Sequence, residues 1–285
     1  MQGLAYDVAG SGPPLVLVHG LASSRRCWDL VVDDLARDFT VYAVDLPGHG
    51  ESDPAPGRDV MPATDMATSI GAFLDAHEID RAHIAGNSLG GWTALEAAAD
   101  GRALSVVALC PAGLWEPLTR PLSTIQFNRR AATALRTAIP TVMRITPLRR
   151  ALMRTGVERT ATVPYDVAVE AAIAQAAASG FEAAHDGALH RRFDRKGDIP
   201  PEVPVTVAFG DRDRLLPAPR FQQRDLAPDH TRWDVLWNCG HAPMWDVPRV
   251  TTELIRLTAT RAATRAATQA ATRAATRAAT RAATP

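Results

Sequence analysis

The chain has 285 residues, 46% of them hydrophobic and 22% charged, a composition that is ordinary for a globular protein of one large domain, with or without an inserted subdomain. The 31 basic and 31 acidic residues cancel, but six arginines and no acids lie from Leu254 to the end, so the body before them has 25 basic and 31 acidic residues. An acidic body of this kind gives no reason to expect nucleic acid as a partner.

Short apolar runs, several of them rich in valine, alternate along the chain with segments of helical periodicity. Such runs are typical of strands covered on both faces, and the alternation predicts an α/β fold, a mostly parallel sheet with helices on both sides. The expected strands are Leu15–Val18, Thr40–Val44, Ala82–Ala85, Ser105–Leu109, Val205–Phe209 and Trp233–Leu236. The expected helices are near Trp28–Arg37, Met61–His77, Leu89–Ala99, Pro217–Leu226 and Val247–Leu257.

Residues 114–193 break this alternation, because they contain no convincing strand and indicate several short helices interrupted by prolines and by Gly156. An all-helical insert between two core strands is best placed above the sheet. We therefore expect an α/β core of residues 1–113 and 190–258, a helical cap at 114–189 and a tail at 259–285.

The tail is of low complexity. Arg-Ala-Ala-Thr repeats six times from Arg261 to Thr284, with Gln269 in place of one arginine. A period of four drifts by about 40° per repeat around a helix, so no apolar face results, and arginines four residues apart repel one another. We expect a frayed helix or disorder without a catalytic role, with a basic arm that touches an acidic surface as the alternative.

Residues 86–90 have the sequence Gly-Asn-Ser-Leu-Gly, follow an expected strand and open an expected helix. This is the context of a nucleophilic serine, here Ser88, on a sharp strand-to-helix turn. The turn lifts the hydroxyl out of the sheet and aims the N–H of Leu89 at a developing oxyanion, with the helix N-terminus adding positive potential. The alternative is a serine that caps a helix after a tight turn.

A serine hydroxyl is a weak nucleophile and needs a base, which in turn needs an orienting carboxylate. Of the eight histidines, His241 follows the last expected strand, on a loop at the carboxyl end of the sheet where Ser88 is also expected. Asp211 and Asp213 both follow the strand Val205–Phe209. Asp213 is favoured as the acid, with Asp211 shaping the turn, and the order serine, aspartate, histidine fits.

Together these segments resemble the α/β-hydrolase superfamily, in its broad group of cap-bearing serine hydrolases. The resemblance covers the core, whereas the cap matches only by position. It rests on Leu17-Val18-His19-Gly20-Leu21 with Trp28 downstream, the run Asp45 to Ser52, the serine motif, the turn Gly210 to Asp213, and Gly240-His241.

The resemblance implies roles for several residues. The backbone N–H of Leu21 becomes the second oxyanion donor beside that of Leu89, the side chains of His19 and His49 become structural, and Asp213 becomes the acid. The implied chemistry is acyl transfer, in which Ser88 attacks a carbonyl and water later hydrolyses the acyl-enzyme. We expect carboxylic esters of small or medium apolar molecules as substrates and no metal or organic cofactor. The expected substrate-binding residues are Trp115, Phe127 and Met143.

Residues 114–160 are strongly basic, with nine arginines against two acids, Glu116 and Glu158. Solvated helix faces are the ordinary explanation, and the alternative is that one or two arginines receive a carboxylate of the substrate. The arginines are Arg120, Arg129, Arg130, Arg136, Arg144, Arg149, Arg150, Arg154 and Arg159.

Other functions on the same fold compete with ester hydrolysis. Serine hydrolases that cleave carbon–carbon bonds in diketo acids share Gly-Asn-Ser-Leu-Gly-Gly but typically have an aromatic residue after the histidine, where this chain has Ala242. A non-catalytic small-molecule-binding protein is the third candidate, and the complete set of three residues argues against it. Relatives with an aspartate nucleophile, the haloalkane dehalogenases and epoxide hydrolases, are rejected because Ser88 occupies that position.

The three cysteines, Cys27, Cys110 and Cys239, have no framework spacing and indicate reduced thiols. The N-terminal residues lack the basic region and apolar run of a signal peptide, and no apolar stretch approaches the roughly 20 residues that span a bilayer. We therefore expect a cytoplasmic protein whose partner is a small-molecule substrate rather than a membrane.

Overall fold

The structure is a computed structural model that describes residues 3–55, 57–117 and 123–282. Its strands form one sheet in the order β1-β3-β2-β4-β5-β6-β7. β1 is antiparallel to β3, and every other neighbouring pair is parallel, which confirms the predicted α/β fold. The strands are β1 (Tyr6–Ala9), β2 (Pro14–Val18), β3 (Thr40–Val44), β4 (Ala82–Asn87), β5 (Ala103–Leu109), β6 (Val205–Gly210) and β7 (Arg232–Leu236).

Helices cover both faces of the sheet. Core helices are α1 (Asp29–Leu35), α2 (Ala63–Ala76), α3 (Leu89–Ala99), α9 (Pro243–Asp246) and α10 (Pro248–Ala282). Helices between β5 and β6 are α4 (Ser123–Ala134), α5 (Ile139–Arg144), α6 (Thr146–Met153), α7 (Tyr165–Ala177) and α8 (Phe181–Leu189). Short 3-10 turns occur at Arg25–Trp28, Arg136–Ala138, Lys196–Asp198 and Arg224–Leu226.

The alternation of side chains along β2 shows how the two faces are filled. Val16 and Val18 point into a core shared with α2 and α3, whereas Leu15 and Leu17 point into a core shared with α1 and α10. All four are fully buried. Because successive residues of a strand face opposite sides, a continuous apolar run is what a doubly covered strand requires.

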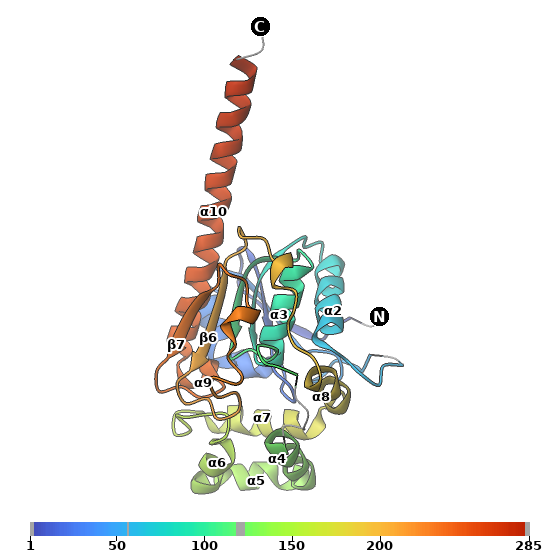
Figure 1. Ribbon diagram of the computed structural model, residues 1–285. Helices are drawn as coiled ribbons and strands as arrows, with labels where there is room; N and C mark the ends of the chain where they lie inside the picture. The colour runs from blue at the N-terminus through green and yellow to red at the C-terminus, as the bar shows by residue number, and fades with distance from the viewer. Residues whose placement is uncertain (1–2, 56, 118–122, 283–285) are drawn as a thin grey trace.

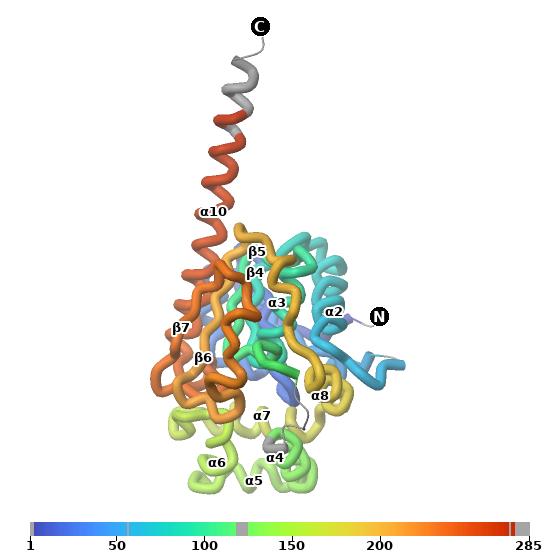
Figure 2. The backbone as a smooth tube through the Cα atoms, in the orientation of Figure 1, coloured from blue at the N-terminus to red at the C-terminus, as the bar shows by residue number. Residues whose placement is uncertain are grey.

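The helical insert, here residues 123–189, forms a layer below the sheet in the view of Figure 1, with α7 next to the core and α4, α5 and α6 farther from it; the tube in Figure 2 follows the same path. The insert contacts the core closely at a pair of glycines, Gly180 and Gly48. The N–H of Gly180 donates to the carbonyl of Gly48 at 2.8 Å, and a Cβ at Gly48 would lie 2.5 Å from the Cα of Gly180. Gly48 also has φ +73°, so glycine is required there twice over.

The expected helix at Pro217–Leu226 is wrong, since the described chain has only a 3-10 turn at its end, Arg224–Leu226. Pro217 and Pro219 lack the N–H groups that a helix needs, and a residue before proline disfavours the helical region. β1 was not expected, because it is a short edge strand with mostly exposed side chains and carries no buried apolar run.

The tail also departs from expectation. α10 continues through the repeat to Ala282 as one helix that projects away from the core (Figure 1). Alanine and arginine are strong helix formers, so intrinsic propensity holds the helix where packing does not. The period of four also lets each threonine hydroxyl donate to the carbonyl four residues before it, from Thr260 to Thr276. Among the described residues no helix combines the length and the hydropathy needed to cross a bilayer.

Candidate active site

The turn between β4 and α3 holds Ser88 in a strained conformation. Its φ is 57° and its ψ is −118°, a region that L-residues rarely adopt. Glycines make the turn possible: a Cβ at Gly86 would collide with the backbone of Gly90, and a Cβ at Gly90 would collide with the carbonyl of Val18. The sequence Gly-Asn-Ser-Leu-Gly therefore builds a tight turn that presents the serine side chain.

Asp213 and His241 are joined as the sequence predicts. His241 Nδ1 lies 2.8 Å from Asp213 Oδ2, and Asp213 Oδ1 accepts the N–H groups of Leu215 and Leu216 at 2.9 Å each. Burial of Asp213 favours its neutral form, but the His241 ring and the two N–H groups outweigh it and hold the pKa of the carboxyl below its usual value. The acid is therefore ionised and fixed behind the ring.

Asp211 does not compete for the ring. Its carboxylate accepts the N–H of Cys239 at 3.1 Å and so ties the loop after β6 to the loop after β7. The sequence suggested that Asp211 shapes its own turn, whereas this hydrogen bond links two loops 28 residues apart in the chain.

The loop after β2 brings Leu21 to a cavity that Ser88 also lines. Leu21 and Leu89 both line a small cavity with Ser88 and His241, and no acceptor within the described residues receives either backbone N–H. A Cβ on Gly20 would lie 3.1 Å from Ser88 Cβ, so glycine lets this loop come close to the serine. Leu21 and Leu89, the two residues whose N–H groups the sequence assigns to an oxyanion, therefore lie at the same cavity as Ser88.

His19 supports that loop from beneath. Its Nδ1 lies 2.7 Å from the carbonyl of Gly20, and its Nε2 accepts the N–H of Leu46 at 2.9 Å, which fixes the neutral tautomer with the proton on Nδ1. Burial lowers the pKa of His19 to about 4 and that of His49 to about 3. The two rings lie 5.4 Å apart, and neither lines the cavities at Ser88.

Two cavities meet at Ser88. The larger has a volume of about 260 Å³ and lies between the core and helices α4, α5, α6 and α7; the smaller has about 30 Å³. Ser88 and His241 line both. No hydrogen bond joins them in the described chain, and such bonds often close only around a bound substrate.

The three expected substrate-binding residues occupy different places. Met143 is buried and lines the larger cavity, and Phe127 lines it while remaining 69% exposed. Trp115 lies in the core, donates its indole N–H to the carbonyl of Arg191 at 3.0 Å, and borders only the smaller cavity. The three residues therefore do not line one cavity: Phe127 and Met143 line the larger one and Trp115 the smaller one.

The arginines of the insert stay away from the cavities. Within the described residues the wall of the larger cavity contains no arginine, lysine, aspartate or glutamate. Arg129, for example, pairs with Glu182 at 3.3 Å and lies over the ring of Phe181. Arg120 lies outside the described residues. A largely apolar wall without charged side chains suits an uncharged ligand.

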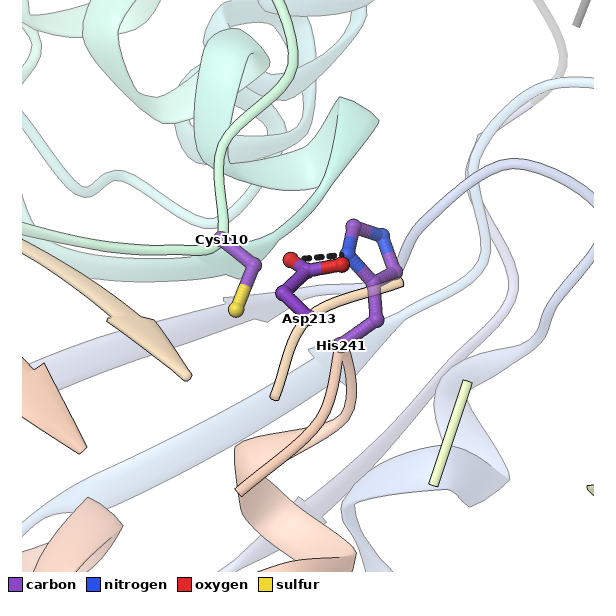
Figure 3. Close-up of side chains that lie close together, drawn as sticks. All are labelled: Cys110, Asp213 and His241. Atoms are coloured by element: carbon purple, nitrogen blue, oxygen red, sulfur yellow. Dashed lines mark hydrogen bonds and ion pairs between the residues drawn. The ribbon is translucent and has the colours of Figure 1, made fainter. Parts of the chain in front are cut away.

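A buried thiol lies beside the acid and the base (Figure 3). The ligand-type atoms of Cys110, Asp213 and His241 are within 4.8 Å of one another, a spacing that could hold a metal ion. Burial raises the pKa of the Cys110 thiol well above its usual value, and the nearby Asp213 raises it further. A protonated thiol is a poor metal ligand, and the Asp213–His241 hydrogen bond already uses the other two groups.

Sequence reasoning missed the residues that hold the histidine loop. The Asn87 amide donates to the carbonyl of His241 at 2.8 Å, the carbonyl of Gly156 accepts the N–H of His241 at 2.8 Å, and the buried carboxylate of Asp246 accepts the N–H of Gly240 at 2.7 Å. Only Asp246 carries a sequence signal, an acid a few residues after the histidine.

Comparisons with known proteins agree with the fold. A family model described as the alpha/beta hydrolase family matches residues 15–254. Over 206 residues the chain is 33% identical to the epoxide hydrolase EphH of Mycobacterium tuberculosis, a match covering 68% of this chain and 94% of that protein. Over 134 residues it is 38% identical to a pimeloyl-[acyl-carrier protein] methyl ester esterase of Stenotrophomonas maltophilia, covering 45% and 49%. A thermophilic esterase of Thermogutta terrifontis superposes with a TM-score of 0.68 at 24% identity, covering 91% of this chain and 93% of that one.

Proposed function

The chain belongs to the alpha/beta hydrolase family, and from that premise we propose that it is a serine hydrolase that cleaves carboxylic esters through an acyl-enzyme on Ser88. One observation carries the proposal. His241 is hydrogen-bonded to Asp213 at 2.8 Å, and it lines the same two cavities as Ser88. A buried carboxylate behind an imidazole beside a serine hydroxyl is what makes that hydroxyl a nucleophile.

In the proposed reaction the Ser88 oxygen attacks the ester carbonyl while His241 takes the hydroxyl proton. The negative charge that develops on the carbonyl oxygen is held by the N–H groups of Leu21 and Leu89. The ester C–O bond then breaks, and His241 returns the proton to the departing alcohol. Water, deprotonated by His241, hydrolyses the acyl-enzyme and frees Ser88. Removing one oxyanion donor from such a site costs about 100- to 1000-fold in rate.

The two cavities suggest how an ester is oriented. With the carbonyl at Ser88, the larger apolar cavity accommodates the bulky group of the ester, and the smaller one, of about 30 Å³, has room for roughly a methyl or ethyl group. The esterase from Stenotrophomonas maltophilia is named for a methyl ester, which fits one small group. We therefore expect esters with one large apolar side and one small side.

The similarity to an epoxide hydrolase calls for a chemical distinction. A carboxylate that opens an epoxide forms an ester, which water can hydrolyse, whereas a serine hydroxyl would form an ether, which water does not readily cleave. Ser88 at the nucleophile position therefore favours esters over epoxides. Diketo acids are disfavoured because the described wall of the larger cavity carries no cationic side chain to receive their carboxylate.

A substrate panel tests the proposal. Short and medium p-nitrophenyl esters, lactones, an epoxide and a diketo acid are assayed with the wild type, Ser88→Ala, Asp213→Asn and, as a control, Ser69→Ala, which removes a buried hydroxyl bonded to Asp65 within α2. Ester turnover is expected in the wild type and the control, with a loss of about 10⁴-fold in Asp213→Asn and at least that in Ser88→Ala.

Labelling with a fluorophosphonate separates the classes. The reagent is expected to modify Ser88 in the wild type and not in Ser88→Ala. Fast turnover of the diketo acid with negligible ester cleavage would overturn the proposed substrate. A folded wild type that neither labels nor turns over any substrate would favour a binding protein.

A further inference from the structure

We propose that Asp246, which lies outside the set of Ser88, Asp213 and His241, is a positioning residue that holds His241 by fastening its loop to the insert segment 154–159. The inference rests on the proposed function, because it assigns a task to a residue of the same site. Asp246 is 1% exposed and lies in α9, five positions after the histidine.

The Asp246 carboxylate gathers N–H groups from two distant parts of the chain. Oδ2 accepts the N–H of Gly240 at 2.7 Å and that of Glu158 at 3.0 Å, and Oδ1 accepts the N–H of Arg159 at 2.6 Å. Hydrogen bonds to an ionised carboxylate are stronger than those between neutral groups. One buried side chain thus joins the insert to the residue directly before the base.

The carbonyl of Gly156 completes the fastening. It accepts the N–H of His241 at 2.8 Å and that of Ala242 at 3.1 Å. Together with the Gly240 N–H on Asp246, all three N–H groups of residues 240–242 are thus hydrogen-bonded to Gly156 or Asp246. A Cβ on Gly240 would lie 2.9 Å from the Gly156 carbonyl oxygen, so the two backbones come this close only because Gly240 has no side chain. The histidine backbone has little freedom while the insert segment is in place.

Surface ion pairs join the insert segment to the loop of the acid, but they are weaker candidates for this task. Arg212 and Arg214 reach the Glu158 carboxylate at 3.3 and 2.5 Å, and all three side chains are partly exposed. Exposed ion pairs are screened by salt and are worth little on average. The buried Asp246 is therefore the residue to test.

The insert segment also borders the substrate. Thr155, Gly156 and Val157 line the larger cavity, next to the residues that Asp246 and the Gly156 carbonyl hold. The wall that contacts the bulky group of an ester is consequently the wall that fixes the base. His241 is held for proton transfer only when this part of the insert is seated on the core.

Asp246→Asn tests the inference, because the amide keeps the shape of the side chain but turns one acceptor into a donor that faces N–H groups. Asp229→Asn, a surface carboxylate paired with Lys196, is the matched control. With ester turnover normalised to the Ser88 that fluorophosphonate titrates, kcat should fall about 10- to 100-fold in Asp246→Asn, the loss expected for a misplaced group. KM should change far less, and the control should match the wild type.

A further readout separates positioning from a general loss of folding. Hydrogen exchange needs no activity: peptides spanning 154–160 and 238–243 should exchange faster in Asp246→Asn, with the rest of the core unchanged.

If Asp246→Asn does not fold, Asp246→Glu decides, since it keeps the charge and displaces it by one methylene. Normal kcat and normal exchange at residues 238–243 in the folded variant would overturn the inference. A wild type that neither labels nor turns over esters would refute the proposed function instead, while the exchange comparison would still show whether Asp246 fastens the loop.

Discussion

The side-chain amide of Asn87 donates a hydrogen bond of 2.8 Å to the main-chain carbonyl of His241, 154 positions later in the chain. The same NH₂ group donates to the carbonyl of Leu109 at 3.1 Å. The residue next to the proposed nucleophile thus holds the carbonyl of the proposed base, whose N–H is held by Gly156. The turn at Ser88 and the histidine loop form one unit.

Asn87→Ala should therefore lower both stability and turnover. It leaves a buried carbonyl of His241 without its donor, which costs about 1–3 kcal/mol in the free energy of unfolding, and kcat for an ester should fall roughly tenfold as the loop loosens. Asn87→Asp should be worse, because a carboxylate would face two carbonyl oxygens. Urea unfolding and steady-state kinetics measure both effects; wild-type values in the alanine variant would contradict this account.

Filling the larger cavity with a bulkier side chain should shift the substrate preference toward esters with a shorter acyl chain. Met143 is 6% exposed and lines that cavity, so Met143→Trp should reduce kcat/KM for esters with a long acyl chain by about tenfold or more. Esters with a short chain should be affected little. Leu148→Trp, at a 40% exposed position outside the described cavity wall, is the control. An equal loss on all chain lengths would mean that the bulky group binds elsewhere.

Acid should destabilise the fold through its buried histidines. Burial lowers the pKa of His19 to about 4 and of His49 to about 3, whereas unfolded histidine titrates near 6.5. Between these values the unfolded state binds more protons, so the stability that each neutral ring contributes is fully present above about pH 6.5 and is lost as pH falls toward the folded pKa.

By pH 5 the loss should reach about 2 kcal/mol for each of the two rings. Urea unfolding of the wild type at pH 8 and pH 5 measures it, and His49→Asn should shrink the difference by about that amount. A variant whose stability depends on pH as steeply as that of the wild type would show that His49 is protonated in the folded state.

Removing the last four of the six repeats, from Gln269 onward, should leave the proposed site intact. α10 contributes buried side chains as far as Ala259, and beyond it Arg265 donates to the carbonyl of Pro201. A chain ending at Thr268 keeps both features. Its ester turnover should equal that of the full chain, with a free energy of unfolding within about 0.5 kcal/mol. A large loss of either would give the basic arm a role in the body of the protein.

Much of the fold was predictable because its signals are local. The run of β3 was predicted to the residue, and α3 was predicted in full, since a valine-rich buried strand and a glycine-flanked turn leave few alternatives. β1 was missed because pairing with β3, not its own composition, makes it a strand. The helix at Pro217–Leu226 was predicted wrongly, because the prediction gave too little weight to Pro217 and Pro219.

The site divides in the same way. Asp213 and His241 could be placed together because both follow parallel strands that end at one edge of the sheet. The positions of Trp115 and Phe127 could not be derived, since tertiary packing decides them: Trp115 packs in the core and Phe127 belongs to the insert. The contacts of Gly156 and Asp246 were also hidden, because a backbone carbonyl has no residue-type signal and its partners lie far away in sequence.

The contact between Gly48 and Gly180 has a consequence for protein engineering. Any chimera that joins a different helical insert to this core must have glycine at both positions, because a methyl group at either would force the two backbone segments apart. An insert taken from another protein is therefore compatible with this core only if it has glycine at the position of Gly180. An insert with a larger residue there would pack less closely against Gly48.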